Sequence, residues 1–445
     1  MKHYLRIPVI LILMVFAIGA KSQEVWSLQK CIDYALENNI EIKQKALNSD
    51  YYGNKLNQAK SDRLPNLNAY LSNDMSYGRS LSYDNTYKNV NSNSSSATVS
   101  SSITLWNGSV LRNTVKKAGF DLQSKLQDLQ KAKDDITLNI AAAYLDILLA
   151  DELVAVDADQ TAITKMQIDR TSKLVDAGSL ARGSLLEIEA QLAREELELV
   201  NQQNSLQLAY LNLYQLLELP SAESFKIVKP NFPMLNAAET MLNSMDIFKT
   251  AVDIRPEIKS AEYQLQSAEK DLSIAKGNQY PDLTFGLNYY NAYNNKYTNT
   301  NGSTINLSDQ LSNNKRYGFG FDLTIPIFNR REVKNGISNA MIQKNNLELE
   351  LQSAKNLLRK DIEQAYANAL AAMKSYMANQ KAVDSMTESF RYTEEKFNVG
   401  MVNSVEYNES KNNLAKAKSD LLQAKYEYIF RTKILDFYAG KAIEL

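Results

Sequence analysis

The sequence predicts an α+β membrane protein built from tandem-duplicated long α-helical hairpins, with four β-strands per chain. Three observations lead to this prediction. A stretch of about seventy residues lacks proline, and from Leu111 to Leu148 its apolar residues lie three or four positions apart, which is helical spacing. Two pairs of segments alternate apolar and polar residues with period two, as strands do. The same order of elements then occurs a second time along the chain.

The long helix is expected at residues 107–176. Its apolar positions advance by about 3.7 residues per turn, so we expect a straight or weakly right-handed helix and not a tight left-handed coiled coil. At a rise of about 1.5 Å per residue the helix reaches roughly 105 Å. Because no globular domain of this size is that long, we expect the helix to be one stave in an elongated wall of helices.

The composition argues against several function classes. The chain has 445 residues, a net charge of -1 and no long basic run, so we expect no nucleic-acid partner. Its single cysteine, Cys31, allows no internal disulfide and is expected to be a small core residue. Its single histidine, His3, lies in a segment that we expect to be removed, and there is no phosphate-binding GxxxxGK[ST] motif. We therefore predict no enzymatic activity, no cofactor and no metal site.

Residues 1–22 have the features of a signal peptide. Lys2 and Arg6 precede an apolar core at residues 7–18, and residues 20–22 form a small-x-small cleavage site. The alternative, a transmembrane anchor, is less favoured because the apolar run is short. The mature chain is therefore expected to be exported.

The first repeat is expected at residues 23–220. Its elements are a helix from about Ser27 to Ser61, a β-hairpin at residues 66–106, the long helix at residues 107–176 and a helix at residues 183–217. Ser27 is expected to be the N-cap of the first helix, and Gly178 is expected to end the long helix as a C-cap glycine. In the hairpin, a polar loop at residues 79–96 is expected to separate the two strands.

The second repeat is expected at residues 254–445. Residues 41–43 recur 216 positions later as residues 257–259, and Trp106-Asn107 corresponds to Phe328-Asn329, 222 positions later. The elements are a helix, a β-hairpin at residues 282–328 with a loop at residues 291–315, a long helix at residues 329–398 and a helix at residues 403–438. The inter-repeat segment at residues 221–253, with a short helix near residues 237–248, fits an equatorial belt around the helices or a simple linker.

Each predicted hairpin has one apolar and one polar face, and a strand of about eleven residues can cross a bilayer at a tilt. An ordinary half-buried sheet is the alternative interpretation. Four strands cannot close a barrel, and an open sheet edge cannot lie in lipid, so several chains must pool their hairpins. Three chains would form a 12-stranded transmembrane β-barrel, continued by a trimeric α-barrel tunnel of twelve staves.

The chain resembles the TolC-like outer-membrane efflux proteins over nearly the whole mature sequence. The resemblance rests on the duplicated order of Ala-Lys, Pro, strand, loop, strand, Asn, long helix and Gly turn, with Pro65 and Pro281 as the two prolines. It implies a homotrimer in outer-membrane lipid of a two-membraned bacterium, extending into the periplasm. It also implies a passive exit duct of a tripartite efflux or type I secretion system, joined by a periplasmic adaptor (membrane fusion) protein to an inner-membrane efflux pump or ABC transporter.

The resemblance further implies that the functional residues lie at the turns between paired helices, which would dock the adaptor and narrow to a gate. The docking tips would comprise Val175, Gly178, Leu180, Arg182, Val399, Gly400, Met401, Val402 and Ser404. The pore gate would comprise Glu406 and Glu409, with Ser184 and Glu187 at the matching positions of the first copy. Rings of carboxylates attract cations and repel one another, which suits a constriction, although a solvated helix face is the alternative.

Two other classes are compatible with parts of the pattern. A periplasmic coiled-coil adaptor is also exported and rich in helices, but it has compact β domains and no duplication. An elongated surface scaffold of helical rods would be a soluble monomer, whereas the duct would be a heat-labile trimer in the outer-membrane fraction.

Overall fold

The computed structural model describes residues 25–81, 85–219, 225–230 and 243–443. The predicted signal peptide at residues 1–22 and part of the predicted inter-repeat segment lie outside the described residues. The chain divides into two compact units, which are described separately. Unit 1 comprises the described residues within Met1–Ala46, Asp128–Ile258 and Ala354–Leu445, and unit 2 comprises those within Leu47–Gln127 and Lys259–Ser353.

The two copies form the same helices at fixed sequence offsets. At an offset of 216 residues, α2 (Leu28–Asn38) and α3 (Ile40–Ser61) correspond to α6 (Ser244–Ile254) and α7 (Pro256–Gly277). At an offset of 222 residues, α4 (Val110–Asp176) and α5 (Arg182–Leu217) correspond to α9 (Glu332–Asn398) and α10 (Ser404–Tyr438). None of the helices in the described ranges carries an apolar run long enough to cross a membrane.

Both long helices begin three residues later than predicted, because the backbone first makes a left-handed turn. Gly108 and Ser109 have φ angles of 62° and 66° in the first copy, and Arg330 and Arg331 have φ angles of 49° and 67° in the second. Such angles are incompatible with a right-handed helix. The turn therefore separates strand from helix in both copies.

The single helix predicted for residues 27–61 is wrong, because Asn39 divides it. Ser27 caps α2 by accepting a hydrogen bond from the backbone N–H of Lys30. At Asn39 the backbone is extended, and the side-chain oxygen accepts from the N–H groups of Glu41 and Ile42 at 3.0 and 3.3 Å, which starts α3. The equivalent break between α6 and α7 lies at Arg255, followed by Pro256 at the first helical position.

The core of unit 1 gathers around the middle of α4, where Ile140, Tyr144 and Leu148 are buried against Cys31 and Leu213. Burying each large apolar side chain contributes about 1.5–3 kcal/mol. Cys31 is fully buried in this core. Burial raises the pKa of the Tyr144 hydroxyl, which therefore stays protonated as a hydrogen-bond donor.

A short parallel sheet in unit 1 joins the chain before α2 to the chain after α5. Its strands are β1 (Val25–Trp26) and β6 (Lys226–Ile227). The Tyr144 hydroxyl lies 3.2 Å from the carbonyl oxygen of Trp26 and 2.6 Å from that of Val228. One side chain of α4 therefore attaches both segments to the core.

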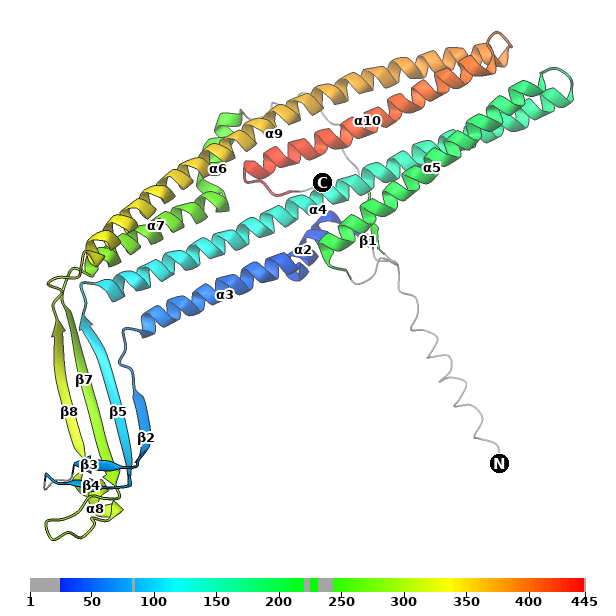
Figure 1. Cartoon of the computed structure of the whole chain (residues 1–445). Helices are drawn as coiled ribbons and strands as arrows, with labels where there is room; N and C mark the ends of the chain where they lie inside the picture. Colours follow the sequence, from blue (N-terminus) through cyan, green and yellow to red (C-terminus); the bar gives the residue numbers. More distant parts are fainter. Residues whose placement is uncertain (1–24, 82–84, 220–224, 231–242, 444–445) are drawn as a thin grey trace, which may run out of the picture. The chain divides into compact units, whose positions relative to one another are not determined.

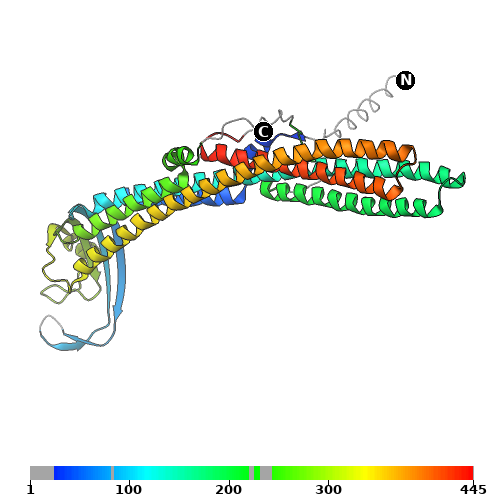
Figure 2. The same cartoon turned by 90° about the horizontal axis from the view of Figure 1, so that it is seen from above.

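Unit 2 contains an antiparallel sheet with the strand order β2-β5-β7-β8. The strands are β2 (Asn68–Ser76), β5 (Ser92–Trp106), β7 (Asp282–Asn294) and β8 (Arg316–Thr324). The parts of α3, α4, α7 and α9 within unit 2 lie side by side (Figures 1 and 2). Their order, α3-α4-α7-α9, matches the order of the strands that they adjoin in sequence. β2 and β8 are the two edge strands, and α3 and α9 are the two outer helices.

The predicted hairpin loops contain more structure than expected. The predicted loop at residues 79–96 holds β3 (Arg79–Leu81), β4 (Tyr87–Asn89) and the start of β5. The predicted loop at residues 291–315 holds the end of β7 and a short helix, α8 (Leu307–Asn313).

Side-chain amides hold α8 against β7. The Gln310 amide accepts from the backbone N–H of Asn294 at 2.9 Å and donates to its carbonyl oxygen at 2.9 Å. Asn314 donates to the carbonyl oxygen of Ala292 at 2.6 Å. These amides satisfy the backbone of β7 where it extends beyond the end of β8.

Polar and aromatic contacts between α4 and α7 join the two copies within unit 2. The rings of Phe120 and Tyr263 stack at a centroid distance of 6.4 Å. Further along the same seam, Ser267 donates to Asp121 at 2.5 Å, the Ser124 and Ser260 hydroxyls are 3.0 Å apart, and Lys117 forms an ion pair with Asp271 at 2.9 Å. This set of contacts is called the copy seam below.

Candidate functional site

The two turns between paired helices in unit 1 have the same geometry. Gly178 and Gly400, 222 residues apart, have φ angles of 74° and 76°, which glycine adopts without a steric penalty. In the first turn Gly178 N–H donates to Val175 O and Ser179 N–H donates to Leu174 O, both at 2.9 Å. This is the Schellman pattern, and the corresponding bonds are present around Gly400.

The helices that leave the two turns begin differently. Asn403 caps α10 by accepting from the backbone N–H of Glu406 at 2.9 Å. Ala181 occupies the same position before α5 and provides no side-chain cap. The predicted docking residue Arg182 is the exposed first residue of α5.

A pocket of about 570 Å³ lies between the two turns. The predicted docking and gate residues that line it are Leu180, Ser184, Gly400, Met401, Val402, Ser404 and Glu406. Met401 is 75% exposed and Val399, which does not line the pocket, is 71% exposed. Val175, Gly178 and Arg182 also lie outside the lining. The turns therefore present apolar side chains to solvent beside a partly polar hollow.

A second pocket, of about 610 Å³, lies between α5 and α10 and contains the other two predicted gate residues, Glu187 and Glu409. The four gate residues are thus divided between two neighbouring hollows. Ser404 donates to the Glu187 carboxylate at 3.2 Å, which links the start of α10 to α5. Glu406 and Glu409 are both exposed to solvent.

Contacts that the sequence did not predict connect the ends of the two copies. Arg170 of α4 donates to the side-chain oxygen of Asn398 at 2.6 Å, and its guanidinium lies 5.9 Å from the ring centre of Phe397. Tyr407 is buried beside Phe397, at 4.6 Å between ring centres. Burial and the charge of Glu394 raise the pKa of Tyr407 to about 12, so it remains a neutral phenol.

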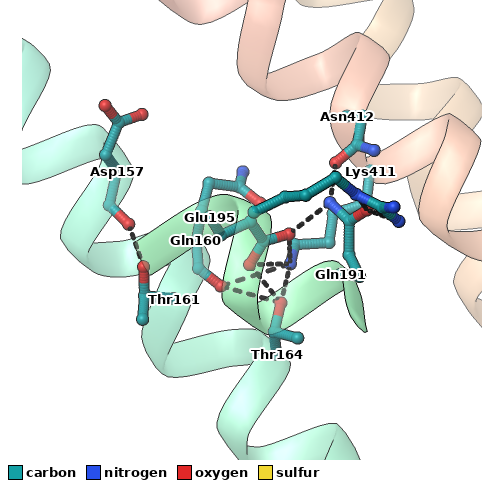
Figure 3. A network of polar contacts seen from close by, with 9 residues as sticks. Asp157, Gln160, Thr161, Thr164, Gln191, Glu195, Lys411 and Asn412 are labelled. Carbon is teal, nitrogen blue, oxygen red and sulfur yellow. Dashed lines mark hydrogen bonds and ion pairs between the residues drawn. The ribbon is translucent and has the colours of Figure 1, made fainter. Parts of the chain in front are cut away.

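A buried lysine joins α10 to α4 and α5 of the first copy (Figure 3). The Lys411 ammonium donates to the Glu195 carboxylate of α5 at 3.1 Å, to the carbonyl oxygen of Gln160 at 3.2 Å and to the Thr164 hydroxyl. Thr164 in turn donates to Glu195 at 2.5 Å. All three ammonium hydrogens therefore have acceptors.

Breaking the buried ion pair of this network is expected to lower the stability of the fold. The side chains of Lys411 and Glu195 are 2% and 11% exposed. Burial lowers the pKa of Lys411, and the charge of Glu195 opposes that shift. Gln191 extends the network by donating to Glu195 at 2.9 Å and to Asn412 at 3.3 Å. Removing one charge of such a pair leaves the other buried without compensation, at a cost of about 3–5 kcal/mol.

The sequence contains one signal for this network. Tyr407, Lys411 and Leu414 are spaced as one face of a helix, and all three are buried. A lysine within an apolar stripe indicates a buried cation that needs an acidic partner. The identity of that partner, Glu195, depends on the packing of helices far apart in sequence.

Comparisons with known proteins agree with this architecture. The sequence profile of the family described as outer membrane efflux protein matches residues 31–218 and 248–441, one segment in each copy. The chain is 25% identical over 419 residues to the outer membrane protein TolC of Escherichia coli (strain K12), covering 91% of this chain and 80% of the relative. It is 23% identical over 415 residues to the probable outer membrane lipoprotein SilC of Salmonella typhimurium, covering 90% and 82%.

Solved structures show the same fold. The chain superimposes on CusC with a TM-score of 0.79 at 18% identity, covering 93% of this chain and 92% of CusC. It superimposes on the outer membrane protein VceC of Vibrio cholerae with a TM-score of 0.76 at 16% identity, covering 94% and 97%. The predicted combination of long helices with a few strands is confirmed, as is the resemblance to TolC-like proteins. The chain therefore belongs to the outer membrane efflux protein family and is an outer-membrane protein.

Proposed function

We infer that this chain is the outer-membrane exit duct of a tripartite efflux or type I secretion system. It works as a homotrimer, in which three four-stranded sheets form a 12-stranded transmembrane β-barrel and the helices form a tunnel through the periplasm. It conducts substrate passively, because energy comes from an inner-membrane efflux pump or ABC transporter. A periplasmic adaptor protein joins the pump to the helix turns.

The observation that carries this proposal is the exposed apolar face of the sheet in unit 2. Apart from Asn73, the odd-numbered residues of both edge strands are apolar or aromatic and exposed, including Leu71 (78%), Met75 (60%), Phe319 (77%) and Phe321 (64%). Polar residues such as Ser72, Asp74 and Asp322 alternate with them. Lipid on one side and water on the other would suit these two faces. The open edges of β2 and β8 require pairing before the sheet can enter lipid.

The predicted docking residues support the assignment of an adaptor. Leu180, Val399 and Met401 are 40%, 71% and 75% exposed at the turns. A helical partner that covers apolar residues at two related turns would bury them from water. The pocket between the turns would receive part of that partner.

Glu406 and Glu409 are proposed to form the gate. In a trimer each would occur three times, and carboxylates held close together attract divalent cations. The test is single-channel recording in planar bilayers with the double variant Glu406→Gln and Glu409→Gln. Divalent cations should no longer block the current through the double variant. The matched variant Asp159→Asn, at an exposed position of α4, should still be blocked. Unchanged block in the double variant would remove these residues as the gate.

The duct itself is tested by oligomeric state and membrane partition. The purified protein should be a heat-labile trimer that inserts into liposomes and forms channels. A natively folded monomer that stays in the aqueous phase would contradict the proposal and favour a surface scaffold.

A further inference from the structure

We propose that neighbouring copies of this chain meet in the same residue alignment as the copy seam, which assigns specific partners across the interface. This inference rests on the proposed trimer and deepens it. Within the chain, β5 and α4 of the first copy lie against β7 and α7 of the second copy, with the copy seam between the two helices. In the proposed trimer, β8 and α9 of one chain lie against β2 and α3 of a second chain in the same way.

The helix contacts provide the first set of partners. Adding 222 to a residue of α4 gives its equivalent on α9, and subtracting 216 from a residue of α7 gives its equivalent on α3. The stacked pair of Phe120 and Tyr263 thus becomes Ile342 facing Leu47 of the second chain. Ile342 and Leu47 are 63% and 67% exposed, although both are large and apolar. Two exposed apolar residues at equivalent positions indicate that a second chain covers both.

The polar contacts of the seam have equivalents that can also pair. The Ser124 and Ser260 hydroxyls become the amides of Asn346 and Gln44, which can donate to each other and accept from each other. The Asp121 and Ser267 pair becomes Gln343 and Tyr51, again an acceptor with a hydroxyl donor. Complementary chemistry at two further positions supports the same alignment.

The strands provide an independent check, because register determines which face each side chain occupies. Within the chain, β5 pairs with β7 such that Ser101 lies opposite Leu287. The same offsets place Leu323 of β8 opposite Leu71 of β2 in the second chain. The offsets also hold for the strand pairing inside each hairpin. Asn68 lies opposite Ser100 in the first hairpin, and their equivalents Thr284 and Asp322 lie opposite each other in the second.

This register brings like faces together across the interface. Leu323 and Leu71, which are 59% and 78% exposed, lie on the apolar face, and Phe319 is placed opposite Met75 on that face. Asp322 is placed opposite Ser72 on the polar face. A slip of one residue would bring every apolar side chain of one strand onto the polar face of the joined sheet.

Two contacts between the copies are not repeated. The ion pair of Lys117 and Asp271 becomes Asn339 and Lys55, which do not carry opposite charges.

The second is a close approach of two glycines. Gly108 lies so close to Gly277 that a Cβ atom on either glycine would overlap the other segment. Their equivalents are Arg330 and Ser61, which both carry side chains. The backbones of neighbouring chains therefore cannot approach as closely at this junction as the two copies do within the chain. The interface between chains is correspondingly more open where strand meets helix.

Disulfide formation tests the register directly. In a Cys31→Ala background, Leu71→Cys combined with Leu323→Cys should oxidise to a covalent trimer, seen at three times the protomer mass without reductant. The control combines Leu71→Cys with Phe321→Cys, displaced by two residues on the same face. Diagonal neighbours in a sheet are about 7–8 Å apart, which is too far for a disulfide. Ser101→Cys with Leu287→Cys should close inside one chain and leave the mass unchanged.

A second pair, Leu47→Cys with Ile342→Cys, tests the helices and is available if the strand variants fail to fold. Native mass spectrometry of the reduced samples separates the outcomes. A trimer that forms no cross-link with either in-register pair, or that cross-links through the displaced pair, overturns the assigned interface and leaves the duct intact. A folded protein that is monomeric when reduced contradicts the duct proposal itself.

Discussion

Lys411 of α10 and Glu195 of α5 form an ion pair at 3.1 Å, 216 residues apart in sequence, with the lysine side chain only 2% exposed. We predict that Lys411→Met lowers the free energy of unfolding by about 3–5 kcal/mol, because it leaves the Glu195 carboxylate buried and unpaired. Lys416→Met, at an exposed position of the same helix, should change it by less than about 0.5 kcal/mol.

The double variant Lys411→Met with Glu195→Leu decides whether the pair acts as a unit. It should recover most of the lost stability, since no charge remains buried. Denaturant unfolding of the detergent-solubilised protein, followed by circular dichroism, measures Lys411→Met, Glu195→Leu, the double variant and the Lys416→Met control. If the double variant is as unstable as the sum of the single changes, the two residues are not coupled.

Gly108 and Gly119 should respond to alanine in opposite directions. Gly108→Ala imposes a Cβ atom at a φ of 62° and against the carbonyl oxygen of Gly277, so we expect a loss of at least about 1 kcal/mol. Gly119 lies within α4 with no neighbouring atom within 4 Å of an added Cβ, so Gly119→Ala should stabilise by about 0.5–1 kcal/mol. Thermal unfolding checks both, and equal effects would contradict the close approach at Gly108.

Tyr144→Phe should cost about 1 kcal/mol, because it removes the hydroxyl that donates to the carbonyl oxygen of Val228 at 2.6 Å. Tyr366 is the equivalent residue of the second copy, and its side chain is only half-buried. Tyr366→Phe should therefore change stability by less than about 0.5 kcal/mol. Hydrogen exchange at β1 and β6 should rise in the first variant alone, and unchanged exchange would argue against this attachment.

Asp157 should make stability depend on pH in an identifiable way. Burial, with the nearby charges of Glu198 and Glu195, raises the pKa of its carboxyl above the ordinary value. A raised pKa favours the folded state below the unfolded pKa of about 3.9, and this contribution is lost as pH rises through the folded pKa. Asp157→Asn should therefore raise the melting temperature at pH 7 and not at pH 3. Asp159→Asn, at an exposed site, should leave the melting temperature unchanged at both pH values. An equal rise in the melting temperature of Asp157→Asn at pH 7 and pH 3 would contradict the assignment.

The long elements could be predicted because their signals are local and repeated. The apolar spacing of α4 can be followed from Leu111 to Leu148, and the alternation in β2 and β8 leaves one largely apolar face. The offsets of 216 and 222 residues, read from a few short matches, apply to every paired helix of the described chain. Repetition made these predictions more certain than either copy alone would have done.

The missed features depend on single side chains or on distant partners. Asn39 divides a helix because its amide caps the next one, although the surrounding apolar pattern is continuous. The pairing of β1 with β6 joins residues about two hundred positions apart, and strands of two residues are too short to show an alternating pattern that would predict the pairing. For the candidate site, the turns around Gly178 and Gly400 were predicted, but the division of the acidic residues between two pockets depends on tertiary packing.

The two offsets differ by six residues, and the difference arises within the second hairpin, in the segment that contains α8. An insertion within a helix would turn everything after it by about 100° per residue and misdirect its apolar stripe. Beyond the end of β8, the amides of Gln310 and Asn314 attach the additional segment to an existing strand without altering any register. The hairpin loops are therefore where descendants of this duplicated gene can gain or lose length, and in the proposed duct they are where an engineered peptide could be displayed at the cell surface.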